Sequence, residues 1–528
     1  MSVDNIQSFS LIEGLMKPEG FNPPVGQCIL IETHISWVLI AEPYAYKIKK
    51  SLNLGFLDFS TLEKRLLFCK EELRLNKRLA PNIYLNIIPI TGTIESPQWG
   101  GEGKPIEYAV KMLAFPQDSQ LDRLLTSGLL HPKIIDVLAQ HIANFHTQTD
   151  IAGLDSLYGE PEIILQPVQE NFLQMREHID NTLALQKLNT LEEWSNETFD
   201  SLQHIFTQRK KAGFIRECHG DMHLRNIAWF DDQPVLFDCL EFNPYLRWID
   251  IISDVGFLVM DLQDRGQSQM AWRFLNKYLE YTGDYAAMGI LRYYLVYRAL
   301  VRAKIDVIRA DQVGINHAEK IEAEKDFYQY LKLALGYIHP PKPQIIITHG
   351  MSASGKSTIS QALLEHFGAL RIRTDVERKR LNDLKPEDDG RSEIDGGIYS
   401  KVTTEKTYSI LKELAGQIID AGYSVIVDGV FLQYQQRQIF KNLAEKKHVS
   451  FTILECKADI ETLRKRIIER KDPISDANLK VLEKQYSIWQ PLHSDEGNAT
   501  LIIDTQLPTD IQFLAKKIKE RGYPPENK

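Results

Sequence analysis

The residues best suited to chemistry form the stretch Gly350-Met-Ser-Ala-Ser-Gly-Lys-Ser-Thr358, which fits the pattern G-x-x-x-x-G-K-[ST]. Its two glycines allow the backbone angles that turn successive N–H groups toward a phosphate chain. Lys356 has the reach to pair with the outer phosphates, and the Ser357 hydroxyl is suited to ligate Mg²⁺. An apolar run at 345–347 precedes the stretch and a helical pattern follows it, so a helix N-terminus adds its positive dipole. The stretch therefore predicts a nucleotide-phosphate site.

Two carboxylates follow this stretch, each at the end of a short apolar segment that reads as a strand. Asp375 stands where a carboxylate commonly binds or deprotonates an acceptor hydroxyl, and we predict that role for it. Asp428 is predicted to hold the water shell of Mg²⁺. The predicted ATP-binding residues are Gly350, Ser352, Ala353, Ser354, Gly355, Lys356, Ser357 and Thr358, with Ser357 also a metal ligand.

Three arginines, Arg464, Arg466 and Arg470, lie in the segment LRKRIIER just before Asp472-Pro473. This segment resembles the mobile lid of small P-loop kinases. The resemblance implies arginines that offset charge on the migrating phosphoryl group, and we predict catalytic roles for Arg466 and Arg470. An ordinary solvated helix face is the alternative.

A second polar group reads His219-Gly-Asp-Met-His-Leu-Arg-Asn226, and a later apolar segment ends in Asp238. An aspartate on a loop can accept a hydroxyl proton, and an asparagine shortly after it can reach a metal ion. The pattern HGD-x-x-x-x-N followed by a strand ending in Asp resembles the catalytic core of aminoglycoside phosphotransferase-like kinases, which are relatives of the protein kinases. The resemblance implies that Asp221 is the base and that Asn226 and Asp238 are metal ligands.

The same resemblance implies a lysine–glutamate pair that orients the ATP phosphates. Lys47 and Glu72 fit that pair, with Lys49 and Glu71 as competing assignments. No G-x-G-x-x-G precedes Lys47, so phosphate positioning is expected to depend on Lys47, Mg²⁺ and the turn at 33–36. A kinase-shaped domain that no longer transfers phosphate is the alternative.

Periodicity indicates which elements position these residues in the first part of the chain. A buried helix at 247–262 carries Asp250 and Asp254, which we expect to cap or brace the catalytic loop. His219 is expected to make structural hydrogen bonds rather than to bind zinc. The other expected elements are strands at 27–40 and 44–50, a helix at 60–80, a strand pair at 83–93 and 106–115, and helices within 120–209 and 270–337.

The last part of the chain alternates strands and helices, which predicts a parallel sheet with helices on both faces. The basic residues at 378–380 and Arg391 could line an acceptor site for an anionic substrate or form a solvated helix face. The expected elements are strands at 344–348, 370–374, 424–427 and 449–454, a helix from 356 and a helix through 408–421.

A chain of 528 residues is too long for one ordinary hydrophobic core. Three prolines within 337–343 forbid a continuing helix there. We therefore predict an α+β protein-kinase-like bilobal domain at 1–338, a linker at 339–343 and an α/β P-loop NTPase domain at 344–528. The whole chain resembles bacterial two-domain proteins that join an aminoglycoside phosphotransferase-like domain to a zeta-toxin or gluconate-kinase-like ATPase.

Composition narrows the class of protein further. The net charge of -9 argues against a protein that coats nucleic acid, and the sequence has no apolar run long enough for a membrane span. Five scattered cysteines without a CxxC pair suit reduced thiols in a cytoplasmic protein.

The sequence thus predicts a bifunctional, ATP- and Mg²⁺-dependent kinase that phosphorylates hydroxyl groups of small molecules. One alternative is a regulatory protein in which one half binds ATP and controls the other. A second is a polynucleotide 5′-hydroxyl kinase, which an acidic chain without interleaved basic and aromatic residues does not favour.

Overall fold

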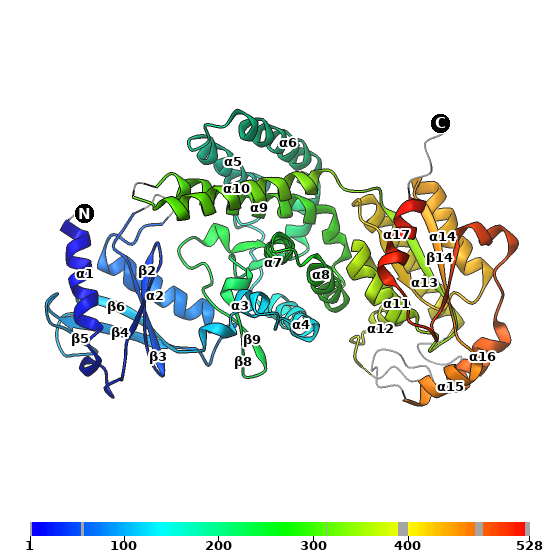
Figure 1. Ribbon diagram of the computed structural model, residues 1–528, viewed down its shortest axis with the longest axis horizontal. Coiled ribbons are helices and arrows are strands. Elements are labelled where there is room, and N and C mark those ends of the chain that lie inside the picture. Colours follow the sequence, from blue (N-terminus) through cyan, green and yellow to red (C-terminus); the bar gives the residue numbers. More distant parts are fainter. Residues whose placement is uncertain (1–2, 54–56, 313, 389–399, 470–478, 523–528) are drawn as a thin grey trace. The chain divides into compact units, whose positions relative to one another are not determined.

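The computed structural model describes residues 3–53, 57–312, 314–388, 400–469 and 479–522. The chain packs into two compact units, and Figure 1 shows their elements. Unit 1 contains Met1–Val137, Asn144–Pro167 and Gln203–Leu258, and unit 2 contains Leu138–Ala143, Val168–Leu202 and Val259–Lys528. Four helices contribute residues to both units: α4 (Pro132–Gln148), α5 (Pro161–Arg176), α6 (Thr182–Lys211) and α7 (Ile251–Asp264). The two units are defined by packing, whereas the predicted boundary at 339–343 divides the chain into segments expected to fold independently. That boundary stays a prediction.

Unit 1 begins with a six-stranded antiparallel sheet of strand order β1-β2-β3-β6-β4-β5. Its strands are β1 (Ile29–Glu32), β2 (Ser36–Ala41), β3 (Tyr44–Lys49), β4 (Tyr84–Gly92), β5 (Pro97–Trp99) and β6 (Glu107–Leu113). Helix α2 (Leu62–Asn76) connects β3 to β4, and the Thr61 hydroxyl caps it by accepting a hydrogen bond from the Lys64 N–H at 3.3 Å. The expected strands and helix of this region are confirmed.

Two elements of this region were not expected from the sequence, namely α1 (Val3–Leu15) and β5. Leu11, Ile12 and Leu15 are buried in one apolar cluster with Trp37 of β2, and Trp99 of β5 packs against that cluster. A short helix of this kind is stabilised mainly by its packing partners rather than by its own propensity. The sequence of α1 by itself therefore gives only a weak indication that this segment is helical.

In the rest of unit 1, residues 218–226 form a loop between two short strands, β7 (Ile215–Glu217) and β8 (Ile227–Phe230). The further elements of unit 1 are α3 (Leu121–Thr126), β9 (Gln233–Leu236) and β10 (Trp248–Asp250). β10 pairs antiparallel with β7, so the segment expected to be helical from residue 247 begins as a strand. Helix α7 starts only at Ile251, which corrects that prediction. β8 and β9 form a hairpin that places Asp238 just beyond its second strand.

Unit 2 contains a five-stranded parallel sheet of order β12-β13-β11-β14-β15. Its strands are β11 (Gln344–His349), β12 (Leu370–Arg373), β13 (Val425–Asp428), β14 (Ser450–Lys457) and β15 (Thr500–Asp504). Its helices are α8 (Ser268–Thr282), α9 (Met288–Ala310), α10 (His317–Ile338), α11 (Lys356–Leu363), α12 (Thr374–Arg380), α13 (Lys401–Asp420), α14 (Tyr434–Lys447), α15 (Ile460–Glu469), α16 (Leu479–Ile488) and α17 (Ile511–Arg521).

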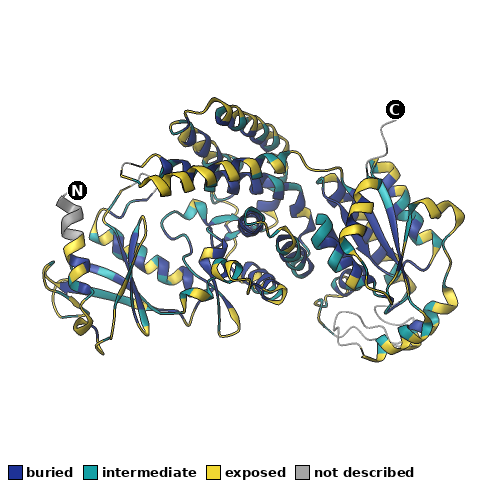
Figure 2. Ribbon diagram, viewed as in Figure 1, coloured by how far each residue is buried: buried dark blue, intermediate teal, exposed yellow. Residues whose placement is uncertain are grey.

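The central strands of this sheet are buried along their whole length, as Figure 2 shows. Residues of β11, β12 and β13 are buried on both sides because helices cover both faces, which is the usual setting of a parallel sheet. The predicted alternation of strands and helices is confirmed. β15 was not expected, and its Ile502 side chain is exposed, so its apolar pattern is less complete than that of the central strands.

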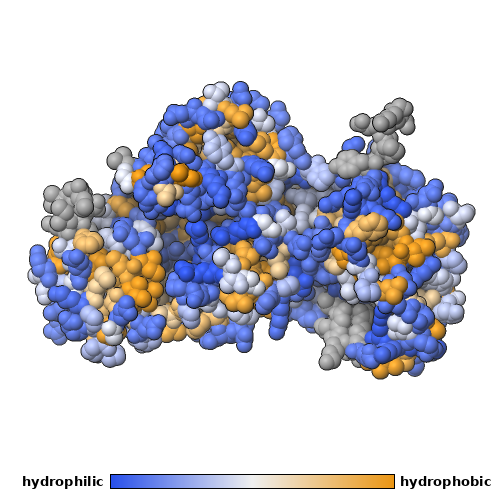
Figure 3. Space-filling view, in the orientation of Figure 1, coloured by the Kyte–Doolittle hydropathy of each residue, from blue (hydrophilic) through white to orange (hydrophobic). Residues whose placement is uncertain are grey.

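Among the described residues, no helix combines the length and apolar character needed to cross a bilayer. On the face of the molecule drawn in Figure 3, hydrophilic residues predominate and apolar groups occupy separate areas.

Candidate active sites

The loop between β11 and α11 requires glycine at its first position. Gly350 has a φ of 149°, and a Cβ there would lie 2.6 Å from the Cys456 carbonyl oxygen and 2.5 Å from the Ser354 hydroxyl. Ala353 and Gly355 also have positive φ values, 64° and 85°. Such alternation of backbone angles makes a concave nest of N–H groups that suits an anion.

Lys356 opens α11 and crosses its own loop. Its ammonium donates to the Met351 carbonyl at 2.6 Å and approaches the Ser354 hydroxyl at 3.5 Å. The loop borders a cavity of about 630 Å³. The residues that line the cavity are Ser352, Ala353, Gly355, Lys356, Ser357, Thr358, Ile359, Ala362, Arg373, Thr374, Asp375, Asp428, Gly429, Val430, Arg466, Thr505, Leu507, Thr509 and Ile511.

Asp428 ends β13 and is buried at one side of the cavity. Its carboxylate accepts hydrogen bonds from Ser360 Oγ at 3.0 Å and Thr348 Oγ1 at 3.4 Å. Burial by itself raises the pKa of Asp428, but the charges of Arg373 and Arg371 outweigh it and hold the pKa below its ordinary value. Asp428 is therefore ionised at neutral pH, which its predicted role as a metal ligand requires.

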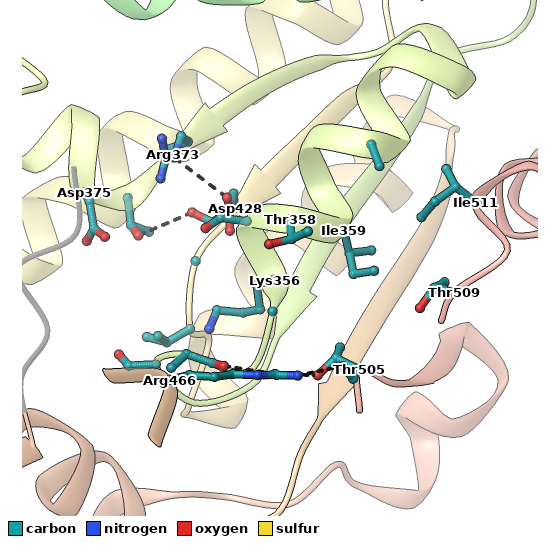
Figure 4. A pocket seen from close by; sticks show the side chains of 18 of the residues that line it. Lys356, Thr358, Ile359, Arg373, Asp375, Asp428, Arg466, Thr505, Thr509 and Ile511 are labelled. Atoms are coloured by element: carbon teal, nitrogen blue, oxygen red, sulfur yellow. Dashed lines mark hydrogen bonds and ion pairs between the residues drawn. The ribbon is translucent and has the colours of Figure 1, made fainter. Parts of the chain in front are cut away.

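Asp375 lies in the first turn of α12, at the carboxyl end of β12. Its Oδ1 accepts a hydrogen bond from Arg378 at 3.1 Å, and its side chain keeps 28% of its surface exposed. In Figure 4, Asp375, Arg373 and Asp428 lie on one side of the cavity and Thr505 lies on the other, with Lys356 between them. The structure thus brings the two predicted carboxylates and the predicted lysine to one cavity.

Arg466 of α15 lies against the phosphate loop rather than in open solvent. Its guanidinium donates to the Ala353 carbonyl at 3.3 Å and to the Thr505 carbonyl at 2.7 Å, and Figure 4 shows its contact with Thr505. Arg464 is half-exposed and pairs with Glu461 at 3.2 Å, as the alternative of a solvated helix face expects. The predicted catalytic residue Arg470 lies outside the described residues.

The basic residues at 378–380 do not form a solvated helix face, which corrects that alternative. Arg378 and Lys379 are buried, and the Lys379 ammonium donates to the Pro386 carbonyl at 3.1 Å. Arg380 pairs with Glu377. These basic side chains therefore have partners within unit 2 rather than pointing into solvent. Arg391 lies outside the described residues.

Sequence reasoning did not single out three residues at this site. Arg373 lines the cavity with its Nε 3.8 Å from an Asp428 oxygen, and the signal available was two arginines alternating within an apolar strand. Thr505 holds Arg466. Gln485 of α16 accepts a hydrogen bond from the Ser352 N–H at 2.7 Å. No local pattern marks Thr505 or Gln485.

In unit 1, Lys47 and Lys49 of β3 point to the same side of the strand and share one carboxylate. Lys47 Nζ lies 2.9 Å from Glu72 Oε1, and Lys49 Nζ lies 2.7 Å from Glu72 Oε2. Lys47 also pairs with Asp238, and Lys49 with Glu241. Burial by itself lowers the pKa of Lys47, but the charges of Asp238 and Glu72 outweigh it and raise the pKa well above its ordinary value.

The competing assignment to Glu71 has no support in this geometry. Glu71 pairs with Arg74 at 2.7 Å and with Arg247 at 2.7 Å, on the adjacent side of α2. Consecutive helical residues point about 100° apart, so only one of two neighbours can meet a given partner. Glu72 is the one between the lysines, and Lys47 is the lysine that also contacts Asp238.

The residues predicted to form a catalytic loop are brought together between β7 and β8. Asn226 Nδ2 donates to Asp221 Oδ2 at 2.9 Å, and His223 Nε2 lies 3.3 Å from the same oxygen. Asp238 follows the β8–β9 hairpin with a φ of 63°, and its side chain is 44% exposed. The Tyr84 hydroxyl accepts a hydrogen bond from the Asp238 N–H at 3.2 Å.

Asp254 of α7 braces this loop through hydrogen bonds to its backbone. Its carboxylate accepts hydrogen bonds from the His219 N–H at 2.9 Å and the Gly220 N–H at 3.0 Å, which confirms the predicted role. His219 Nε2 donates to the Phe237 carbonyl at 2.9 Å, so this histidine is structural as expected. Asp250 instead pairs with Arg209 at 2.6 Å and does not contact the loop.

Replacing Asp254 by asparagine is expected to loosen the catalytic loop, because one of the two buried amides loses its acceptor at a cost of about 1–3 kcal/mol. Hydrogen exchange of the full chain should show faster exchange at His219 and Gly220. Asp250→Asn removes a buried charge close by in the chain but not this brace, so it should leave both amides protected. Equal protection in the two variants would contradict the assignment.

The turn between β1 and β2 uses its own polar groups. The Thr33 hydroxyl accepts the Ser36 N–H at 2.9 Å and the Ile35 N–H at 3.4 Å, and the Thr33 N–H donates to the Ser36 carbonyl at 2.9 Å. These three amides are engaged within the turn. The predicted contribution of the turn to phosphate positioning therefore lacks N–H donors from residues 33, 35 and 36.

Residues 345–492 match the family model described as an AAA domain. The chain is 31% identical over 465 residues to the uncharacterized protein Rv2004c of Mycobacterium tuberculosis (strain ATCC 25618 / H37Rv), a match that covers 88% of this chain and 91% of that protein. Among solved structures, a gluconokinase from Sinorhizobium meliloti 1021 is 17% identical with a TM-score of 0.26, covering 34% of this chain and 94% of its own. A choline/ethanolamine kinase family protein from Mesorhizobium loti is 10% identical with a TM-score of 0.37, covering 62% of this chain and 100% of its own.

The predicted fold classes are confirmed. The C-terminal half is a P-loop domain, because its loop joins the central strand of a parallel sheet to a helix and lies within the matched AAA domain. The N-terminal half is protein-kinase-like, with an antiparallel sheet, a helix that carries the glutamate of a buried lysine–glutamate pair, and a braced polar loop.

Proposed function

This chain belongs to the family of the Mycobacterium tuberculosis protein Rv2004c, and from that premise and its two sites we propose a phosphotransferase with two nucleotide sites, each of which phosphorylates a hydroxyl group of a small molecule. The P-loop part lies within the matched AAA domain, and the N-terminal part has a protein-kinase-like arrangement of sheet, lysine–glutamate pair and polar loop. The observation that carries the proposal is the convergence of Lys356, Asp375 and Asp428 on one cavity.

The P-loop site fits a nucleotide phosphate and a divalent cation. The close approach at Gly350 leaves room for backbone N–H groups but not for a side chain, and the positive φ at Ala353 and Gly355 curves the loop. Ser357 and Asp428 supply the oxygen ligands that Mg²⁺ prefers. Held by these two residues, Mg²⁺ would supply positive charge to offset the charge of the phosphates.

The side chains of this site have separable roles in the proposal. Lys356 leaves its carbonyl partner to pair with the outer phosphates of ATP. Asp375 accepts the proton of the acceptor hydroxyl, and Arg378 holds its carboxylate in place. Arg466 fixes the loop main chain at Ala353. The proposal keeps Arg470 as a lid arginine, although it lies outside the described residues.

The N-terminal site has the groups for the same reaction on a different scaffold. Asp221 would accept the hydroxyl proton, and Asn226 holds its carboxylate by a hydrogen bond. Asn226 and Asp238 offer oxygen ligands for Mg²⁺. Lys47, fixed by Glu72, would move from Asp238 to the ATP phosphates when the metal binds.

One observation favours a second function for this half, that of a nucleotide sensor controlling the other half. The backbone N–H groups of residues 33, 35 and 36 form hydrogen bonds within their own turn. The phosphates would therefore have fewer N–H donors than in a kinase with a glycine-rich loop. A sensor needs binding without transfer.

The test is a screen of the purified full chain for transfer of γ-labelled phosphate from ATP to pooled sugars, aminoglycosides and other hydroxyl metabolites, with oligonucleotides as a separate pool. The proposal expects a labelled small molecule whose formation requires Mg²⁺. Label in the oligonucleotide pool alone would favour a polynucleotide kinase, and absence of label in every pool would contradict the proposal.

Asp375→Asn is expected to leave ATP binding near normal and to lower acceptor phosphorylation by the P-loop half by roughly two to four orders of magnitude, as for loss of a general base. Calorimetry gives the first quantity and initial rates the second. Asp420→Asn, which alters an exposed pair with Lys447, serves as control. A matching loss of ATP affinity in Asp375→Asn would place this carboxylate on the metal instead.

A further inference from the structure

Helix α8 packs into the P-loop sheet of unit 2 through side chains that complete that sheet. Trp272 packs against the apolar cluster around Ile346 and Ile426. Asn276 accepts the Arg371 N–H at 2.6 Å and donates to the Ala369 carbonyl at 3.0 Å. β12 is an edge strand whose neighbour in the sheet is β13. The Asn276 amide therefore satisfies backbone groups that an edge strand otherwise leaves unpaired.

One turn further along α8, Glu280 is buried against Arg371. Glu280 Oε1 lies 2.8 Å from Arg371 Nη2, and the two side chains are 3% and 5% exposed. The Glu280 carbonyl also accepts a hydrogen bond from Arg380 of α12 at 2.7 Å. A buried guanidinium requires a compensating carboxylate, because an unpaired buried charge is costly.

Arg371 connects this pair to the metal-binding side of the cavity. Its Nη1 donates to Ser360 Oγ at 3.3 Å and to the Ser357 carbonyl at 3.4 Å. Ser360 Oγ accepts from Arg371, and its hydroxyl hydrogen can be donated to Asp428 Oδ2 at 3.0 Å or to the Ser357 carbonyl at 3.2 Å. Arg371 thus contacts Glu280 through Nη2 and is linked to Asp428 through Nη1 and the Ser360 hydroxyl.

We propose that Glu280 is a positioning residue of the P-loop site, which holds the Arg371 guanidinium away from Asp428 and keeps that carboxylate available to Mg²⁺. The inference rests on the proposed phosphotransfer at this site. Without the Glu280 charge, Arg371, which is separated from Asp428 by the Ser360 hydroxyl, can be neutralised by that carboxylate. An ion pair between them would compete with the metal, so the Mg²⁺ requirement would rise while metal-free nucleotide binding would change little.

The experiment uses the full chain in an Asp221→Ala background, so that turnover reports the P-loop half. Calorimetry measures ATP binding with and without Mg²⁺, and ATP turnover is measured as a function of Mg²⁺ concentration. Glu280→Gln is expected to raise the Mg²⁺ concentration for half-maximal turnover about tenfold or more, the usual consequence of losing an outer partner of a metal ligand. Affinity for ATP in EDTA should stay within about twofold of the background.

Two further variants separate positioning from stability. Arg273→Gln breaks another α8 contact, the 2.8 Å pair with Glu365, and should leave the Mg²⁺ requirement unchanged. Glu280→Leu combined with Arg371→Met removes both buried charges, a replacement that folded proteins tolerate. Because the competitor of Mg²⁺ is then gone, the double variant should return toward the background Mg²⁺ requirement.

The outcomes are distinguishable. If Glu280→Gln does not fold, Glu280→Asp takes its place, because it keeps the charge but withdraws it from Arg371. A Mg²⁺ requirement equal to that of Arg273→Gln, or a double variant as impaired as the single one, would overturn the role of Glu280. If the background itself neither binds Mg²⁺·ATP nor turns it over, the proposed function of the P-loop site fails instead.

Discussion

Lys356→Ala is expected to lower ATP turnover by the P-loop half by roughly three orders of magnitude, the loss typical of removing a preorganised charge-stabilising group. The ammonium is held by the Met351 carbonyl within its own loop, so it needs a short movement to meet the outer phosphates. Alanine leaves the backbone nest intact but removes the cation that offsets charge on the phosphoryl group in the transition state of transfer. Initial rates in an Asp221→Ala background measure the effect.

The control for this variant is Lys441→Ala, which removes a half-buried lysine paired with Asp495 at 3.0 Å. It changes the net charge of the chain equally and should turn over ATP at the background rate. Turnover in Lys356→Ala within about threefold of this control would mean that the loop does not hold the transferred phosphate, since charge removal at such a site costs far more.

In a Lys356→Ala background, Asp221→Ala and Asp238→Ala are expected to fail in different ways. Loss of Asp221 should spare Mg²⁺·ATP binding and lower transfer by roughly two to four orders of magnitude, because the base is gone. Loss of Asp238 should weaken Mg²⁺·ATP binding itself about tenfold or more, since a metal ligand is lost. It also frees Lys47 from its Asp238 partner, so metal-free ATP binding should not weaken.

Calorimetry with and without Mg²⁺, together with single-turnover transfer, separates the two effects. Asp232→Ala, a change in the exposed β8–β9 turn, is the control. The N-terminal half is a sensor rather than a kinase if the background binds Mg²⁺·ATP, transfers no phosphate, and loses nothing further on replacement of Asp221.

The parts that the sequence predicted well are those whose chemistry is local in the chain. The phosphate loop needs its glycines, lysine and serine within one turn between a strand and a helix, and the structure has that arrangement. The catalytic loop is likewise local, since Asn226 reaches back to Asp221 across a single turn. The parallel sheet followed from the alternation of strands and helices, and the kinase-like domain from the resemblance of the catalytic-loop motif.

The parts that the sequence left open depend on tertiary contacts. Two lysines spaced by two residues share a strand face, so the pattern could not choose between Lys47 and Lys49, and the structure shows both on Glu72. The helical pattern of α8 gave no sign that Asn276 and Glu280 contact Arg371 of β12. A polar residue on the buried face of a helix does not reveal which residue it contacts in the folded protein. For the same reason the pattern at 378–380 left open an acceptor site or a solvated helix face, and the structure contradicts the solvated face.

The contacts of α8 also bear on the predicted boundary at 339–343. A fragment that begins after this linker lacks Glu280, so Arg371 would be buried without its carboxylate. It also lacks Asn276 at the β12 edge. We therefore propose that a P-loop fragment must begin before Ser268 to bind nucleotide as the full chain does.

The central claim, that two sites transfer phosphate independently, is tested most directly by γ-phosphate transfer from ATP in four full-length proteins. These are the wild type, Lys356→Ala, Asp221→Ala and the double variant, each assayed against the acceptor pools in Mg²⁺. The account predicts that each single variant retains one labelled product, that the two products differ, and that the double variant forms neither. Loss of all labelled products in one of the single variants would contradict it, because both reactions would then depend on a single site.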